Sequence, residues 1–312
     1  MGAHFASPRA VILMYHSVVE DPAETATTIR ISQSRASFEW QISRLAKRFK
    51  PVSFDEVVGF VANGRPLPKG AVAVTFDDGF ADNYEVALPI LQRYGIPAMF
   101  YIMVNAVDSG VPPWYCRLTY VFHSTVLSTW THPTSSKIFQ LGDPAERTAA
   151  LSAAWDLGAA LSGEAQDRFM SEVQNVLQVA PLSAGSKLMM DWSQVRALKK
   201  SGHLIGAHTL SHPNLAHVPV QEARSEIQGC KQKLEQELGE AVPHFSYPHP
   251  ALNPEWSPQT LELTRQAGFQ SAVLTKAGAV QPGHDPLALM RIPGDEDSGS
   301  WLWQLERAFA GF

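Results

Sequence analysis

The chain has 312 residues, of which 45% are hydrophobic and 18% are charged, and its formal net charge is −5. This composition indicates a soluble globular protein with a sizeable core, and the lack of a broad basic charge excludes nucleic acid as an expected partner. Two cysteines cannot form a framework of several disulfides, and no apolar run has the length of a signal-peptide core or a membrane span. We therefore expect a cytoplasmic protein without a membrane span, although a trimmed export signal would leave the same sequence.

Apolar runs alternate with helical patterns along the chain, which favours βα units around a parallel sheet. Strands are predicted over 10–15, 72–76, 98–104, 204–207, 245–247, 271–275 and 287–292. Helices are predicted over 36–49, 54–63, 81–94, 191–201, 219–239 and 257–268. This α/β pattern alone does not separate a closed barrel from a doubly wound open sheet, and both place their chemistry at the C-terminal ends of the strands.

Two short strings follow predicted strands and together indicate a metal site. In Thr75-Phe76-Asp77-Asp78-Gly79, paired acids before a glycine place two carboxylates on a sharp turn, where one can bind a metal and the other act as a base. In His208-Thr209-Leu210-Ser211-His212, a helical turn would put both imidazoles on one face. Two histidines and one carboxylate leave a position open for water, as in a catalytic zinc site. Alone, the first string is more often a simple turn and the second a solvated or core pair, but their joint occurrence after strands favours the metal site.

Together these strings resemble those of the NodB-homology polysaccharide deacetylases, metal-dependent hydrolases that remove N- or O-acetyl groups from carbohydrates. Met14-Tyr15-His16-Ser17-Val18 resembles the opening strand of the branch that includes poly-N-acetylglucosamine deacetylases. Gly202-His203-Leu204-Ile205-Gly206-Ala207 is similar to the usual approach to the second string. Phe245-Ser246-Tyr247-Pro248-His249-Pro250 stands where the family carries Phe-Arg-x-Pro-Tyr-Gly. The resemblance covers residues 10–104 and 188–293, and it implies a distorted (β/α)7-type barrel.

The pattern of residues assigns roles to the strings. Asp78, His208 and His212 are the predicted ligands of one divalent metal, zinc by default, with cobalt, nickel or manganese able to occupy such a site. Asp77 is the predicted general base. The resemblance places an oxyanion-stabilising backbone N–H at His249, and Tyr247 in the same string is assigned to the substrate side.

Two features of the family pattern are missing. Ser246 stands where many members carry the arginine that orients the base, and Arg291, near the end of a predicted strand, could supply that charge instead. No Leu-x-x-His string for the usual acid histidine is present near the C-terminus. His16 is the predicted proton donor or acetate-orienting group, with His249 and His284 as the other candidates. The alternative is that His16 only ties down the end of the first strand.

Asp78 and His208 lie 130 positions apart, and the resemblance implies about half that separation. We therefore predict a single deacetylase domain over 1–312 that carries a helical insertion over 105–187, in which Asp143 and the following proline begin a helix. The insertion could be a substrate-contacting lid, or it could pad the barrel wall or form a dimer contact. Trp114 within it could line a sugar subsite or anchor the insertion to the barrel.

The sequence thus predicts a metal-dependent hydrolase that removes acetyl groups from an N-acetylated carbohydrate, with an O-acetyl ester as the neighbouring option. A carbohydrate-binding pseudoenzyme and an amidohydrolase for a cyclic amide are the alternatives. Intact Asp77, Asp78, His208 and His212 favour an enzyme, because a binding module has no need for a base beside a metal. The glycan, the native metal and the oligomeric state stay open.

Overall fold

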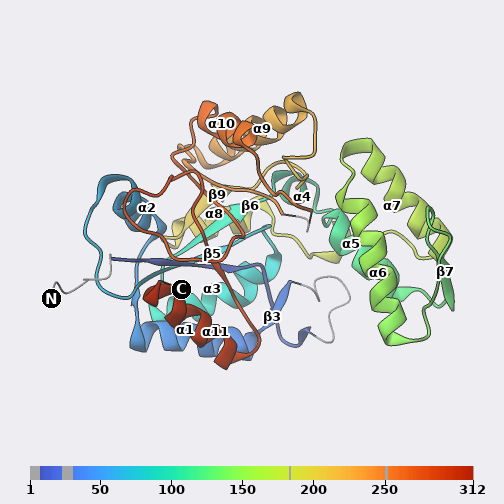
Figure 1. Ribbon diagram of the computed structural model, residues 1–312, viewed down its shortest axis with the longest axis horizontal. Coiled ribbons are helices and arrows are strands. Elements are labelled where there is room, and N and C mark those ends of the chain that lie inside the picture. The colour runs from blue at the N-terminus through green and yellow to red at the C-terminus, as the bar shows by residue number, and fades with distance from the viewer. Residues whose placement is uncertain (1–7, 23–30, 183, 250–251, 312) are drawn as a thin grey trace.

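A curled sheet of parallel strands forms the centre of the molecule, seen in a computed structural model that describes residues 8–22, 31–182, 184–249 and 252–311 (Figure 1). Its strands are β1 (Val11–Tyr15), β4 (Lys50–Pro51), β5 (Ala71–Phe76), β6 (Ala98–Ile102), β9 (Leu204–Ala207), β10 (His244–Ser246), β11 (Ser271–Val273) and β12 (Ile292–Pro293). They lie in the order β11-β10-β9-β6-β5-β1-β12, and β4 pairs with β5. Every neighbouring pair is parallel, which confirms the predicted α/β class.

The two edges of this sheet are drawn together by the segment that leads into β12. Leu13 of β1 is paired with Ile292. Three residues earlier, Leu289 accepts a hydrogen bond from Leu274 N at 2.8 Å and donates to Ala272 O at 2.9 Å, beside β11 at the opposite edge. The same short segment therefore contacts both edges, and the curled sheet agrees with the predicted distorted barrel.

Helices cover the outside of the sheet. They are α1 (Arg35–Arg48), α3 (Leu88–Tyr94), α8 (Trp192–Lys200), α9 (Val220–Leu238), α10 (Pro258–Gln266) and α11 (Ser298–Ala310), with a π-helical turn η2 (Asn83–Ala87) before α3. Helix α2 (Phe54–Asn63) instead packs against the side chains of the barrel interior. Strands β1 and β5 are buried along their whole length, as expected of continuous apolar runs in a parallel sheet. Along each strand, successive side chains point alternately to the helix-covered side and to the barrel interior. Ile12, Ala73 and Tyr101 lie on the interior side, where they pack with α2.

The bounds predicted from the sequence agree with those of most of these elements to within a few residues, but some predictions were wrong. The strand predicted over 98–104 ends at Ile102, because a short helix, α4 (Val104–Ser109), begins two residues later. The last strand lies at Ile292–Pro293, and Leu289 makes only an isolated bridge. Helix α11 was not predicted, since its first turn contains Ser298 and Gly299, which are weak helix formers.

The insertion stands beside the barrel and has a hydrophobic core of its own (Figure 1). Its elements are α5 (Trp114–Ser124), a hairpin of β7 (Thr129–Thr131) and β8 (Ile138–Gln140), α6 (Pro144–Ala159), α7 (Gly163–Leu177) and the 3-10 turn η3 (Ala184–Ser186). The predicted start of α6 is confirmed, because the Asp143 carboxylate accepts a hydrogen bond from Glu146 N at 2.9 Å. The hairpin was not predicted. A further pair of short strands, β2 (Ser17–Val19) and β3 (Ser32–Ser34), lies near the end of β1.

No helix within the described ranges combines the length and the apolar character that crossing a bilayer requires.

Candidate active site

The two carboxylates of the first string leave β5 on a tight turn, as the sequence predicts. Asp78 has φ 76° and Gly79 has φ 86°, so both occupy the left-handed region. This conformation is unfavourable for a residue with a side chain, although aspartate tolerates it better than most. The turn sends the two neighbouring carboxylates to different partners, and both are buried.

The second string is a loop, and the prediction of a helical turn over His208–His212 was wrong. Thr209 and His212 have φ values of 62° and 64°, which no helix contains. The reason is that its backbone N–H groups find other partners. Leu210 N and Ser211 N donate to the Glu226 carboxylate at 2.8 and 2.9 Å, and His212 N donates to Thr209 Oγ1 at 3.0 Å. The loop still brings the two imidazole centroids to 4.9 Å from each other.

Asp78, His208 and His212 form a buried cluster whose atoms fit a divalent metal. Oδ1 of Asp78 lies 3.3 Å from His208 Nε2 and 3.6 Å from His212 Nε2. Three potential ligand atoms of this cluster lie within 4.8 Å of one another. Oδ1 has no hydrogen-bond partner among the residues that the structure describes, although it is buried. A bound cation would satisfy this oxygen, and two imidazole nitrogens with one carboxylate form a donor set suited to zinc.

The orientation of His208 agrees with this arrangement. Its Nδ1 lies 2.9 Å from the carbonyl oxygen of Ser246, which can only accept a hydrogen bond. Nδ1 therefore carries the proton, and Nε2 presents its lone pair to the cluster. Metal-binding histidines are commonly oriented in this way, by a hydrogen bond from the ring nitrogen that does not bind the metal.

At neutral pH, two of the three candidate ligands are in the deprotonated state that binds a metal. Burial raises the pKa of Asp78, but His208 and His212 lower it more, so the group is a carboxylate at neutral pH. Burial lowers the pKa of His212 to about 4, so this imidazole is neutral. The pKa of His208 is lowered by burial and raised more strongly by Asp78 and Asp77, so its proton competes with a cation.

Asp77 lies beside the cluster, in the same cavity, and is held by Arg291. The guanidinium donates from Nη1 to Asp77 Oδ1 at 2.8 Å and from Nη2 to Oδ2 at 2.7 Å. Ser246 Oγ donates to Oδ2 at 3.2 Å, and Arg291 Nε donates to the carbonyl of Leu274 at 2.9 Å. Burial raises the pKa of Asp77, but the charge and hydrogen bonds of Arg291 together with His208 and His16 outweigh it and lower the pKa, so the carboxylate stays ionised.

A small cavity of about 50 Å³ connects these groups. Its lining comes from the C-terminal ends of the strands and from the insertion, and comprises His16, Ile31, Asp77, Asp78, Tyr115, Trp155, His208, His212, Tyr247, His249 and Thr275. Eight candidate residues named from the sequence thus lie in one place: seven line the cavity, and Arg291 stands behind Asp77.

The remaining lining residues from the strings occupy different positions in the cavity. His16 follows β1, and its carbonyl accepts a hydrogen bond from Asn83 Nδ2 at 2.6 Å. His249 lies at the rim, where its ring nitrogens are 3.4 Å from Thr275 Oγ1 and 3.3 Å from Asn253 Oδ1. Tyr247 is buried, with its ring edge-on to Phe245. Pro250, the last residue of this string, lies outside the described residues.

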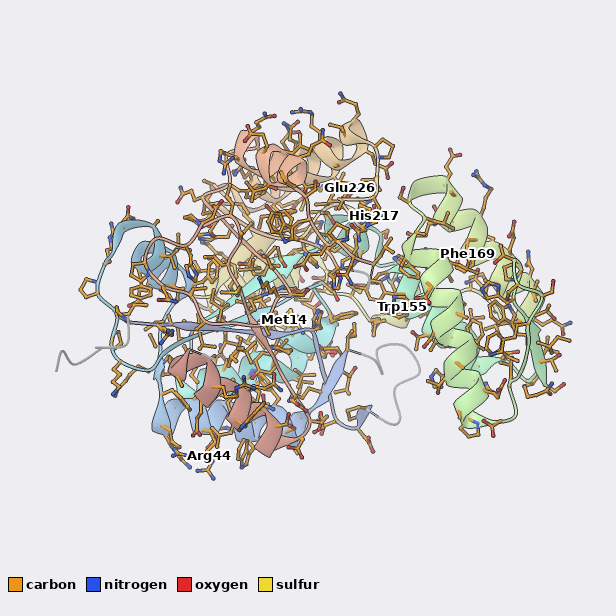
Figure 2. The ribbon with its side chains drawn as sticks, viewed as in Figure 1. Met14, Arg44, Trp155, Phe169, His217 and Glu226 are labelled. Carbon is orange, nitrogen blue, oxygen red and sulfur yellow. The ribbon has the colours of Figure 1, made fainter. Side chains whose placement is uncertain are left out.

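The assignment of Trp114 to the substrate side needs correction. Its side chain is 2% exposed and packs inside the core of the insertion, with its ring centroid 5.4 Å from that of Trp155. The aromatic residues that reach the cavity are Tyr115 and Trp155. Figure 2 shows Trp155 on the side of the insertion that faces the barrel. A helical pattern shows which face is apolar but not which neighbour it meets, so the sequence did not separate these residues.

Comparisons with known proteins show which proteins the chain resembles. A model of the polysaccharide deacetylase family matches residues 64–272. The poly-beta-1,6-N-acetyl-D-glucosamine N-deacetylase of Escherichia coli K12 is 32% identical over 100 residues, which make up 32% of this chain but only 14% of that relative's length. The protein YxkH of Bacillus subtilis is 21% identical over 283 residues, or 90% of this chain and 70% of that protein.

Two solved structures share the fold. IcaB from Ammonifex degensii superposes with a TM-score of 0.62 at 20% identity and covers 97% of each chain. The Streptococcus pyogenes deacetylase PplD, solved in complex with acetate, gives a TM-score of 0.62 at 19% identity, over 96% of this chain and 99% of that one. At these identities the similarity establishes the fold and leaves the substrate to be inferred from the site.

Proposed function

This chain belongs to the polysaccharide deacetylase family, and from this premise we propose that it is a metal-dependent hydrolase of the acetamido group of an N-acetylated carbohydrate. The observation that carries the proposal is the buried cluster of Asp78, His208 and His212 beside Asp77, a carboxylate that is already ionised and oriented. An O-acetyl ester is the neighbouring substrate, because the same groups would serve.

The size of the cavity supports a small acyl group. A single water needs roughly 10–15 Å³ by a comparable measure, so about 50 Å³ suits an acetyl group better than a whole sugar ring. The sugar would remain at the rim, near His249 and the insertion. The same limit counts against the cyclic-amide alternative, because there the ring itself would have to enter.

A divalent cation held by Asp78, His208 and His212, zinc by default, would polarise the acetyl carbonyl and make water more acidic. Asp77 would take one proton from the attacking water as the oxygen bonds to the acyl carbon. Because the pKa of Asp77 is lowered, its carboxylate is a weaker base than that of a free aspartate. It contributes to the reaction by being ionised and by being held in one orientation by Arg291. The C–N bond then breaks, His16 supplies a proton to the leaving nitrogen, and the products are acetate and the free amine.

An acetate-release assay on metal-loaded protein tests the proposal. The panel contains N-acetylglucosamine oligomers with β-1,4 and β-1,6 linkages, peptidoglycan fragments and acetylated xylan, each with wild type and Asp77→Asn. We expect acetate from at least one N-acetylated oligomer with wild type only. Binding of the oligomers without acetate release from any of the substrates would support the pseudoenzyme alternative.

A further inference from the structure

One tyrosine from the insertion reaches the reaction cavity with an unpaired hydroxyl. Tyr115 is the second residue of α5, is 4% exposed, and lines the same cavity as Asp77 and Asp78. Its ring centroid lies 5.1 Å from that of His212. The hydroxyl is buried, and no group in the described part of the chain forms a hydrogen bond with it. A buried polar group without a partner is unfavourable, so such a group at a cavity indicates that the partner is a ligand.

The surroundings of the hydroxyl show where it is directed. Burial raises the pKa of Tyr115 well above its ordinary value, and Asp78 raises it further, by its charge and as a nearby acceptor that falls short of hydrogen-bond geometry, as does the charge of Asp77. The hydroxyl therefore keeps its proton and lies near the reacting groups. The Tyr247 hydroxyl in the same cavity is also buried without a hydrogen bond in the described part of the chain, but apart from burial the group that most affects its pKa is Thr264 of α10 and not a carboxylate of the site. Of these two phenols, Tyr115 is the one directed at the reaction centre.

The core of the insertion fixes this ring in place. Tyr115 packs against Trp155 at 5.8 Å and edge-on to Trp114 at 5.9 Å between centroids. Trp114 in turn lies against Gly158 of α6, where an added Cβ would come within 2.6 Å of the indole ring. The absence of a side chain at this one position lets α6 approach α5 closely. The hydroxyl is thus a donor whose position is set before any ligand arrives.

Three carboxylate oxygens of the cavity face groups other than Tyr115. Both oxygens of Asp77 accept from Arg291, and Oδ1 of Asp78 faces the two imidazoles. We propose that the Tyr115 hydroxyl is a further catalytic group, which donates a hydrogen bond to the oxygen of the acyl group as negative charge develops there. This inference rests on the proposed function. It gives the insertion a part in the chemistry, in addition to any part in covering the substrate.

The variant Tyr115→Phe tests the inference, because it keeps the ring and removes only the hydroxyl. Three quantities are compared with wild type: kcat for acetate release, zinc affinity by competition with a chelator, and the Kd of acetate as a probe of the zinc-loaded site. We expect kcat to fall by about 10²-fold or more and acetate to bind roughly tenfold more weakly or worse. Zinc affinity and the melting temperature should stay unchanged. Tyr120→Phe, on the same helix but outside the cavity lining, is the matched control.

Two results would overturn the inference. One is a wild-type kcat and acetate Kd in Tyr115→Phe. The other is a fall in zinc affinity with an unchanged kcat at saturating zinc, which would mean that the hydroxyl serves Asp78. If wild type released acetate from no carbohydrate, the proposed function would fail, and the acetate Kd of the two proteins would still decide whether the hydroxyl contacts the acyl oxygen.

Discussion

Arg291 and Asp77 meet through two parallel hydrogen bonds although 214 positions separate them in the chain. Ser246 lies beside both, since Arg291 Nη2 donates to Ser246 Oγ at 3.2 Å and this hydroxyl lies 3.2 Å from Asp77 Oδ2. Ser246 occupies the position where the resemblance implies an arginine. The positive charge that faces Asp77 is therefore supplied by the segment that leads into β12, and the short serine side chain leaves the space that the guanidinium fills.

Replacing Arg291 should change the pH at which the enzyme loses activity in acid. The guanidinium lowers the pKa of Asp77, so Arg291→Gln raises it, and Asp77 becomes protonated at a higher pH. The acidic limb of the kcat/KM profile should move upward by about one unit or more, the usual scale for loss of an adjacent opposite charge. The profile of Arg44→Gln, a change at a surface arginine labelled in Figure 2, should match wild type. An unmoved limb in a folded Arg291→Gln protein would show that Asp77 is not the group that titrates.

Metal content should depend on His212 and not on a histidine close to it in the chain. His212→Ala removes one of three ligands, so the purified protein should lose most of its metal by elemental analysis. His217→Ala is the control, because His217 is exposed and its Nε2 lies 3.0 Å from the carbonyl oxygen of Asn253, outside the cluster. Equal metal in His212→Ala and wild type would exclude His212 as a ligand.

The two neighbouring carboxylates should separate into a base and a ligand. Asp77→Asn should keep the metal and lose about 10²-fold or more of kcat, the scale for loss of a general base. Asp78→Asn should lose both, because Oδ1 of Asp78 is the oxygen that faces both imidazoles. Metal analysis and kcat of both variants check this, and an empty site in Asp77→Asn would mean that the roles are assigned wrongly.

Glu226 should matter to the metal although it is not a ligand. Its carboxylate accepts from Leu210 N, from Ser211 N and from Ser211 Oγ at 2.6 Å, and so sets the shape of the loop between the two histidines. Glu226→Ala should weaken zinc binding by about 10- to 100-fold, as measured for second partners of metal ligands. Glu222→Ala, one turn earlier on α9, is the matched control. Unchanged zinc affinity in Glu226→Ala would show that the loop holds its shape alone.

His16 should matter most when the leaving group needs a proton. An amine leaves an acyl carbon only when it is protonated, whereas the phenolate of an activated aryl acetate leaves unaided. His16→Ala should therefore slow hydrolysis of an N-acetyl sugar far more than that of the aryl ester, with unchanged metal content. Similar slowing of both substrates would assign His16 to another step.

The parts of the site that could be predicted are those where a short string decides the geometry. Asp77, Asp78 and His208 each follow directly after a buried strand, and the ends of parallel strands meet at one edge, so their proximity follows from chain order alone. The loop at His212 was predicted wrongly because its shape depends on Glu226, a partner on another helix. Tyr115 and Trp155 could not be distinguished from Trp114, since all three belong to apolar faces and only the packing of α5 on α6 decides which ring meets the barrel.

The partner of Asp77 comes from the last part of the chain to be made. Arg291 lies in the segment that contacts both edges of the sheet, and it follows every other candidate site residue in chain order. The nascent chain therefore presents Asp77 without its counter-ion until this last segment docks. The stretch that the family model matches, residues 64–272, contains neither His16 nor Arg291. A chain stalled after this stretch would carry His16 but lack Arg291, so the Asp77 carboxylate would be left without the guanidinium that pairs with it in the complete fold.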